Sequence, residues 1–258
     1  MSLNVIQGHL RASIAGRAQR VGPFLITFEP DTATAGRNYA IPDDGATPSA
    51  ADIAALVARF AALGRTPRLE YVDPAPAVDA ALAAASFIVE NRYPLMTIAP
   101  GELADPPMLG GLEVVLATSD ERLWQAATVQ NAAYGEGDAT EHDVARLRRT
   151  VDHGGAVTVA LLAGEPVGSG LFTVPRHGLT EIAAVGVAER YRRRGIAAVI
   201  GYRLTRAAID AGVVPFLQAE GDPEQRIYAR IGYHRVGSLT AISRRDGGVP
   251  AVHLGEPV

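Results

Sequence analysis

Apolar residues follow two different periods along the chain, and the period predicts the type of each element. In the first hundred residues, helical spacing is clear over 50–63, where Ser49 is a candidate N-cap with Asp52 three positions later. A short alanine-rich helix is expected to follow Pro76 and to end at residue 85. Apolar or alternating runs predict strands at 23–30, 38–41, 68–72, 87–90 and 95–98, the last two as a hairpin.

The second half of the chain alternates between the two periods more often. Helices are predicted after Ser119, after Thr140, from Ile196 and near 223–230. Strands are predicted at 112–117, 156–163, 166–174, 181–187, 215–219, 233–238 and 239–243. The expected order is therefore β-α-α-β-β-β-α-β-α-β-β, which is typical of a mixed α/β fold.

The two halves are separated by a stretch with neither period. Residues 100–111 are rich in proline and glycine, which favours a linker. We therefore expect two domains, at residues 1–105 and 106–258.

One stretch joins a strand to a helix through a basic turn. The apolar run 181–187 leads into Arg192-Arg193-Arg194-Gly195, and helical spacing starts at Ile196. A small-residue turn that enters a helix directs free backbone N–H groups and the positive end of the helix dipole at one point. A phosphate or pyrophosphate is the natural ligand of such a turn, although a solvated basic turn or a nucleic-acid contact would produce the same pattern.

Composition narrows the chemistry. The chain has 258 residues, a net charge of −4 and no cysteine, so disulfides, thiolate catalysis and cysteine–metal sites are excluded. All 24 basic residues are arginine, which excludes a lysine Schiff base. The acidic balance argues against a dedicated nucleic-acid partner. No apolar run reaches membrane-spanning length and the histidines have no metal-ligand spacing, so we expect a cytoplasmic protein without membrane contact or bound metal.

The basic turn resembles the acyl-CoA-binding signature of the GNAT superfamily of N-acyltransferases. That signature reads Arg/Gln-x-x-Gly-x-Gly/Ala between a strand and a helix, and Arg192, Gly195 and Ala197 match it. The order of elements over 112–243 is also similar to the order of one complete GNAT fold. The resemblance implies a mixed-sheet GNAT fold in the C-terminal half, with acetyl-CoA as the co-substrate.

The same resemblance implies roles for individual residues. The donor's pyrophosphate would bind at Arg192, Arg193, Arg194, Gly195, Ile196, Ala197 and Ala198, and its pantetheine arm along the backbone of Val185 and Val187. The N–H of Val187 would stabilise the oxyanion. Tyr228 lies in a segment similar to the family's Leu-Tyr-x-x-x-Gly-Phe and would protonate the leaving thiolate, or else is a packing residue. Glu181, eleven residues before Arg192, is the candidate base, or else an exposed strand-end carboxylate.

An internal repeat links the two halves. Gly64-x-x-Pro-x-Leu69 matches Gly212-x-x-Pro-x-Leu217, each after a helix and before a strand. At the place of the basic turn, the N-terminal copy has Asp43-Asp44-Gly45, whose carboxylates would repel a pyrophosphate. We therefore expect residues 1–105 to be a partial or degenerate GNAT-like domain that does not bind CoA, or an unrelated α/β cap.

The expected function is transfer of an acetyl group to a primary amine by direct attack on the thioester. The acceptor would be a small molecule or a peptide, and Trp124, Tyr134, Phe172 and His177 are candidate linings of its pocket. Two alternatives stay open: a non-catalytic acyl-CoA-binding regulator of the same fold, and a nucleic-acid or protein interaction module that uses Arg192–Arg194. Whether the chain forms a homodimer is also left open.

Overall fold

The chain forms two compact units. The structure, a computed structural model, describes residues 2–29 and 35–244. Of these, unit 1 takes the residues up to Tyr93 together with 237–244, and unit 2 takes Pro94–Val236. The chain therefore passes from unit 1 to unit 2 before the proline- and glycine-rich stretch 100–111, and it returns to unit 1 at Gly237.

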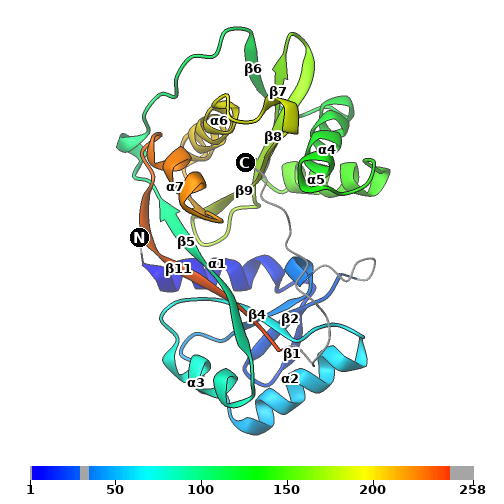
Figure 1. The fold of residues 1–258 in the computed structure, drawn as a ribbon, viewed down its shortest axis with the longest axis vertical. Coiled ribbons are helices and arrows are strands. Elements are labelled where there is room, and N and C mark those ends of the chain that lie inside the picture. The colour runs from blue at the N-terminus through cyan, green and yellow to red at the C-terminus, as the bar shows by residue number, and fades with distance from the viewer. Residues whose placement is uncertain (1, 30–34, 245–258) are drawn as a thin grey trace. The chain divides into compact units, whose positions relative to one another are not determined.

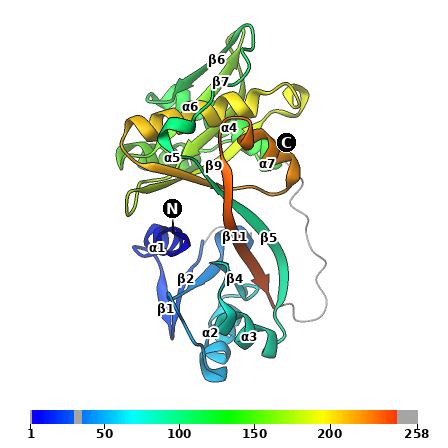
Figure 2. The ribbon, with the colours of Figure 1, turned by 90° about the vertical axis from the view of Figure 1, so that its left-hand side faces the viewer.

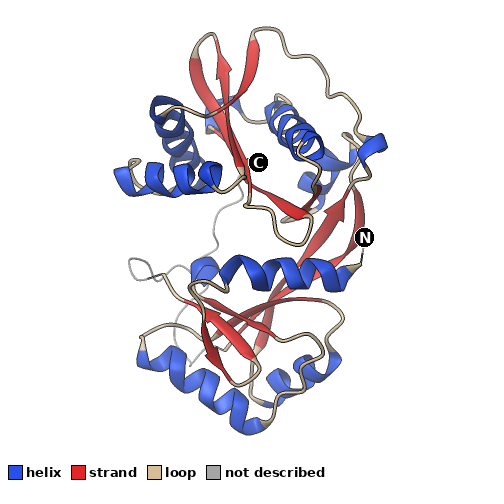
Figure 3. Cartoon of the chain, turned by 180° about the vertical axis from the view of Figure 1, so that it is seen from behind, coloured by secondary structure: helices blue, strands red, loops and turns tan. Residues whose placement is uncertain are grey.

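Unit 1 is a sheet with helices on both faces. Its strands lie in the order β1-β2-β3-β4-β11, and residues 239–243 of β11 run antiparallel to β4. Helices α2 and α3 cover one face and α1 covers the other (Figure 3). The elements are α1 (Leu3–Ile14), β1 (Gln19–Val21), β2 (Phe24–Thr27), a 3₁₀ turn (Ala35–Arg37), β3 (Tyr39–Pro42), α2 (Ala50–Ala62), β4 (Arg68–Val72), α3 (Pro76–Ala84) and β11 (His234–Ser243).

Unit 2 contains the strands β5-β10-β9-β8-β7-β6 in this order, with both parallel and antiparallel pairs, and β5 starts within unit 1. Helices α4 and α5 lie on one side of the unit 2 strands and α6 on the other (Figure 1). The elements are β5 (Ile88–Thr97), a 3₁₀ turn (Pro100–Glu102), β6 (Leu112–Leu116), α4 (Asp120–Tyr134), α5 (Glu141–Asp152), β7 (Ala156–Leu162), β8 (Glu165–Phe172), β9 (Leu179–Val187), a 3₁₀ turn (Glu189–Tyr191), α6 (Ile196–Asp210), β10 (Val214–Gln218) and α7 (Asp222–Ala229).

Helix starts were predicted well because their signals are local. Ser49 accepts a hydrogen bond from the backbone N–H of Asp52 in a capping box, and Thr140 caps α5 in the same way. Ser119 caps α4 by accepting from the N–H of Arg122, without a reciprocal bond. Gly135 ends α4 in the left-handed conformation at φ 69°.

Two strand predictions are wrong. The hairpin expected at 87–98 is one strand, β5, and the pair expected at 233–243 is also one strand, β11. Figure 2 shows both as long, continuous arrows. The periodicity of residues 1–20 is weak and left a short helix or a loose start open; the structure has the helix, α1, followed by β1, which was not predicted. Pro30, the last residue of the strand expected at 23–30, and residues 245–258 of the second expected domain lie outside the described residues.

One order of elements occurs twice along the chain. The series β1-β2-β3-α2-β4-α3-β5 corresponds to β7-β8-β9-α6-β10-α7-β11. Gly64 and Gly212 follow α2 and α6, both with left-handed φ. Ahead of this series, unit 1 has the single helix α1, where unit 2 has a strand and two helices. The N-terminal copy is therefore partial, as the repeat predicted.

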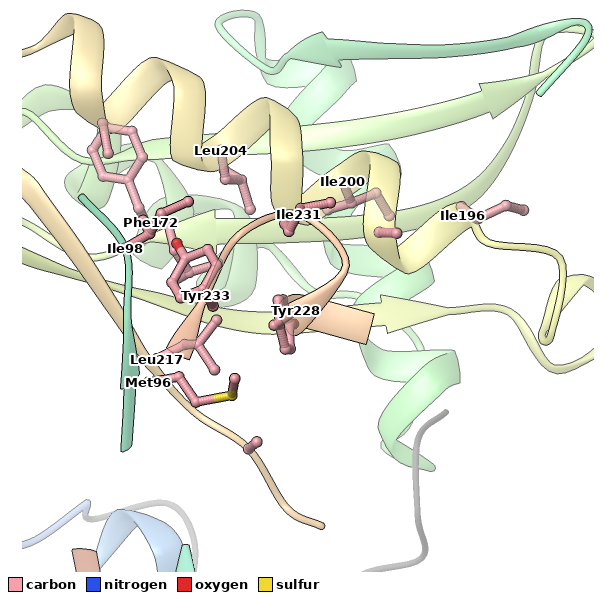
Figure 4. Close-up of a cluster of buried hydrophobic side chains, with 14 of the residues drawn as sticks. Met96, Ile98, Phe172, Ile196, Ile200, Leu204, Leu217, Tyr228, Ile231 and Tyr233 are labelled. Atoms are coloured by element: carbon pink, nitrogen blue, oxygen red, sulfur yellow. The ribbon is translucent and has the colours of Figure 1, made fainter. Parts of the chain in front are cut away.

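The core of unit 2 holds α6 against the sheet. Ile196, Ile200 and Leu204 are buried on α6 (Figure 4). A Cβ on Gly168 would come within 2.8 Å of Ile200, and one on Gly170 within 3.0 Å of both Ile200 and Leu204, so glycine is required for this approach. The packing fixes the N-terminus of α6 beside the end of β9.

Candidate functional site

An opening between two parallel strands lies at the centre of the site. β10 pairs with β9 at Val214–Leu179, Pro215–Thr180 and Phe216–Glu181. β9 continues to Val187 beyond the last of these pairs. The second half of β9 therefore has an edge that β10 does not cover.

The backbone of Val187 faces this uncovered edge. Ala188 donates to the carbonyl of Val167 at 2.9 Å, and the register places Val187 opposite Gly168. Because antiparallel residues alternate between bonding their neighbour and facing away, Val187 directs its N–H and C=O away from β8. Its N–H therefore faces the opening, and its role as the oxyanion donor stays a prediction.

A β-bulge precedes this position. Ala184 has φ 53°, and the register between β8 and β9 shifts there, so that two residues of β9 lie opposite Gly170. The carbonyl of Val185 lies 3.5 Å from the hydroxyl of Tyr134. The bulge changes the direction of β9 at the place where contacts with the pantetheine arm were expected.

The turn between β9 and α6 presents backbone donors, as expected. Gly195 adopts φ 85° and precedes Ile196, the first residue of α6. The earliest bond of the helix is from Ala198 to the carbonyl of Gly195. In the part of the chain that the structure describes, the backbone N–H groups of residues 193–197 donate no hydrogen bond. This arrangement is typical of an anion-binding helix N-terminus.

The three arginines of the turn have different environments. Arg192 points inward, and its guanidinium donates to the carbonyls of Val187 and Ala133, both at 3.1 Å. Arg193 is exposed, with φ 60°. Arg194 lies 5.3 Å from the centre of the Tyr191 ring. Arg192 therefore connects the turn to β9 and to α4 through hydrogen bonds. The exposed positive charge of the turn comes from Arg193 and Arg194.

Tyr228 of α7 lies on the α6 side of the opening. It is 8% exposed, packs against Gly201 of α6 and meets the Tyr233 ring edge to face at 5.9 Å. Figure 4 shows it among the buried side chains around α6. Burial, followed by the nearby charge of Glu224, raises its pKa well above the usual value of 10. The phenol therefore keeps its proton more strongly than a free tyrosine does.

Glu181 lies on the opposite face of the sheet. Glu181 and Ala183 are two positions apart on β9, so their side chains share a face of the sheet. Ala183 packs against buried residues of α4 and α5, so this is the face that these two helices cover. The side-chain amide of Gln218 on β10 donates to its carboxylate at 2.8 Å. Glu181 is thus half-buried beside the point where β9 and β10 separate, and Gln218 is a neighbour that no sequence motif indicated.

The candidate acceptor residues do not gather in one place. Trp124, 44% exposed, lines an open pocket of about 560 Å³ with Glu165 and Arg190. Phe172 is in the core and His177 is an exposed turn residue. Tyr134 is at the β9 opening, where its ring lies 3.5 Å from the place that a Cβ on Gly186 would occupy.

The equivalent opening in unit 1 is filled by the unit's own helix. β3 and β4 are registered at Ala40–Leu69. Beyond that pair, the side-chain amide of Gln7 on α1 donates to the carbonyl of Pro42 at 3.1 Å and accepts from the N–H of Val72 at 3.0 Å. Gln7 is 8% exposed. Its amide therefore bridges the two strands as an added peptide would.

Charge in this second opening is opposite to that of unit 2. Arg11 of α1 donates to the carbonyl of Pro42 at 2.7 Å and forms an ion pair with Asp43. Arg20 pairs with the same carboxylate at 2.8 Å. Burial pushes the pKa of Asp43 upward, but these two guanidinium groups outweigh it and lower the pKa. The carboxylate in the turn after β3 therefore binds guanidinium groups, whereas the turn after β9 offers N–H donors that suit an anion.

Among the described residues, no three acidic or histidine side chains gather as metal ligands would. None of the helices in residues 2–29 and 35–244 combines the length and apolar character needed to cross a bilayer.

Comparison with known proteins identifies the fold. A GCN5-related N-acetyltransferase from Kribbella flavida superposes with a TM-score of 0.78 at 24% identity, over 95% of this chain and 96% of that one. One from Sphaerobacter thermophilus gives 0.56 at 20% identity, over 70% and 59%. A tandem GNAT protein from the clavulanic acid biosynthesis pathway gives 0.59 at 14% identity, over 84% and 82%.

Sequence comparison agrees for the part of the chain that holds the site. No curated protein matches the chain. The profile of the Acetyltransferase (GNAT) family matches residues 122–233, which span α4 to the end of the segment containing Tyr228. Residues 122–233 are therefore a domain of the Acetyltransferase (GNAT) family, in a chain whose two halves both have a GNAT-like fold.

Proposed function

We propose that unit 2 is an N-acetyltransferase that moves an acetyl group from acetyl-CoA to a primary amine. The observation that carries the proposal is the uncovered edge of β9, which has the N–H of Val187 along it and the N-terminus of α6 at its end. The pyrophosphate would bind the backbone N–H groups of 193–197, with Arg193 and Arg194 adding positive charge. The pantetheine arm would pair with β9 at Val185 and Val187 as an added strand does.

Glu181 is the proposed base. The amine nitrogen attacks the thioester carbon, and its proton passes through water to the Glu181 carboxylate. Gln218 holds that carboxylate in place from the neighbouring strand. The oxyanion that forms accepts a hydrogen bond from the N–H of Val187, and one such donor contributes about 3–4 kcal/mol.

Tyr228 is the proposed acid. When the carbon–sulfur bond breaks, the thiolate takes the phenolic proton, and the products are an amide and a free thiol. A free phenol has a pKa of about 10 and a thiol about 8.5, so burial of Tyr228 makes the transfer less favourable than these values imply. Direct attack is supported because the chain has no cysteine to carry an acetyl group.

Two alternative functions would use the same basic turn. A non-catalytic acyl-CoA-binding regulator would use the same donor contacts and turn over no amine. An interaction module would use the exposed arginines of the turn, and the net charge of −4 disfavours a polyanion partner. A small-molecule or peptide acceptor, a cytoplasmic location and a homodimer stay predictions.

A thermal-shift assay with acetyl-CoA, free CoA and longer acyl-CoAs tests the donor site, and an amine panel with thiol detection tests turnover. We expect stabilisation by acetyl-CoA of about 2.7 kcal/mol at one hundred times its Kd. Absence of stabilisation by every CoA compound would refute the donor site. Stabilisation without turnover of any amine would support the regulator instead.

We also propose that unit 1, the degenerate copy expected within residues 1–105, does not bind the donor. Gln7 already bridges Pro42 and Val72, which are the backbone groups that a pantetheine amide would need. The guanidinium groups of Arg11 and Arg20 already pair with Asp43 at the turn after β3, so they are not free for a pyrophosphate.

Titration calorimetry tests this assignment through the stoichiometry. We expect one acetyl-CoA per chain, and one per chain also in Gln7→Ala, because Arg11 still binds the carbonyl of Pro42 and the carboxylate of Asp43. A stoichiometry of two in the wild-type protein would show that unit 1 binds donor and would overturn the proposal for that unit, but not the proposal for unit 2.

A further inference from the structure

A second phenol lies at the β9 opening, on the face opposite Tyr228. Tyr134 is the last residue of α4, and its ring packs against Gly186 of β9. Tyr134 and Tyr228 interact electrostatically, and the carboxylate of Glu224 acts on both. The two phenols therefore approach the same opening from opposite faces of the sheet.

The backbone around Tyr134 is held in place, which fixes the point from which its side chain extends. Gly135 ends α4 with a left-handed φ, and its N–H bonds the carbonyl of Asn131. A Cβ on Gly186 would lie 2.7 Å from the Cβ of Ala133, so α4 approaches β9 as closely as a glycine permits. This contact sets the distance between the Tyr134 ring and the strand.

We propose that the Tyr134 ring limits the length of the acyl group that unit 2 accepts. The proposal rests on the acyltransfer function proposed above, in which the acyl carbonyl lies at the N–H of Val187. On the α6 side of that point, Tyr228 is buried against Gly201 and Tyr233. A longer chain must therefore extend toward α4, where the ring beside Gly186 stands in its path.

The aromatic ring of Tyr134, and not its hydroxyl, limits the length of the acyl chain. The hydroxyl lies 3.5 Å from the carbonyl of Val185, at the limit of hydrogen-bond distance, so it contributes little to holding the ring. The contact with Gly186 comes from ring carbons. The ring is also 40% exposed, so its removal leaves open space at the surface and does not create a sealed cavity.

The test compares acetyl-, butanoyl- and hexanoyl-CoA with one amine in the wild-type protein, Tyr134→Ala and Tyr134→Phe. We expect Tyr134→Ala to raise kcat/KM for hexanoyl-CoA relative to acetyl-CoA by at least about 10-fold, because the misfit of a single methylene already changes such ratios by about 10- to 200-fold. Tyr134→Phe should keep the wild-type ratio, because it keeps the ring.

Trp124→Ala is the matched control. It also removes an exposed aromatic ring from α4, but ten residues away, which is about 15 Å along a helix. We expect its acyl-CoA ratio to equal that of the wild-type protein. The thermal shifts given by the three acyl-CoAs provide a second readout that does not depend on the amine.

The outcomes separate this inference from the function on which it rests. Turnover of acetyl-CoA with an unchanged ratio in Tyr134→Ala would overturn the role of the ring and leave the function standing. An equal gain in Tyr134→Phe would also overturn it, because the ring would not be the cause. If no acyl-CoA stabilises the wild-type protein, both proposals fall.

Discussion

Replacement of Arg192 by alanine separates structural support from donor binding in the basic turn. The guanidinium holds two carbonyls, those of Val187 and Ala133, each at 3.1 Å. A hydrogen bond from a charged group contributes about 1.5–3 kcal/mol when it is well buried. Arg192 is only half-buried, so we discount each bond to about 1 kcal/mol for solvent screening. The variant should therefore lose about 2 kcal/mol of its free energy of unfolding.

Thermal unfolding measures this loss. For a chain of this size, 1 kcal/mol corresponds to about 2–4 °C, so the Tm should fall by about 4–8 °C. Arg193→Ala is the matched control, because Arg193 is exposed and keeps its left-handed backbone with either side chain. Its Tm should stay within about 1 °C of the wild-type value, since substitutions at such surface positions cost little.

The comparison also predicts how donor affinity responds. Arg193→Ala removes a surface charge, so its KM for acetyl-CoA should rise, and the rise should shrink at high salt. Arg192→Ala frees the end of β9, so its KM should rise at every salt concentration. Equal Tm values for the two variants would refute the reasoning, because Arg192 would then contribute no more to the fold than its exposed neighbour.

Three further predictions concern neighbouring elements. Gly186→Ala should lower the free energy of unfolding by about 1–3 kcal/mol in chemical denaturation, because its Cβ would lie 2.7 Å from that of Ala133; an unchanged midpoint would contradict this packing. Tyr228→Phe should lower kcat by a constant factor from pH 7 to 9.5, because the raised pKa keeps the wild-type phenol protonated throughout; full activity would exclude it as the acid. Thr140→Ala should cost about 1 kcal/mol at pH 7 and less at pH 3. Burial raises the pKa of Asp143, but the Thr140 hydrogen bonds outweigh it, so this stability is present above the usual carboxyl pKa and is lost as the pH falls; an equal cost at both pH values would contradict the capping box.

The predictable part of the fold depends on neighbours in sequence. Ser49, Ser119 and Thr140 mark helix starts because each caps an N–H three positions later. The basic turn was also predictable, since Gly195 supplies its positive φ and the helix follows directly. Signals of this kind need no knowledge of the rest of the chain.

The part of the fold and site that could not be predicted depends on contacts between residues far apart in the sequence. Gln7 meets Val72, and Gln218 meets Glu181, only after the sheets have formed. The inward turn of Arg192 depends on the carbonyl of Ala133, 59 residues earlier. Tyr134 could be placed at a helix end from Gly135, but not beside β9. The continuity of β5 and β11 also depends on partner strands, which a local pattern does not contain.

The path of the last strand has a consequence for synthesis on the ribosome. β4 ends at Val72, yet its partner in β11 starts at Leu239, so the pairing that completes unit 1 joins residues far apart in sequence. An N-terminal domain normally folds while the rest of the chain is still being made. Here one edge of β4 stays unpaired until residues 239–243 have emerged. Truncated chains that stop before residue 239 should therefore be protease-sensitive in unit 1, and that unit should be protected only when Leu239–Ser243 are present.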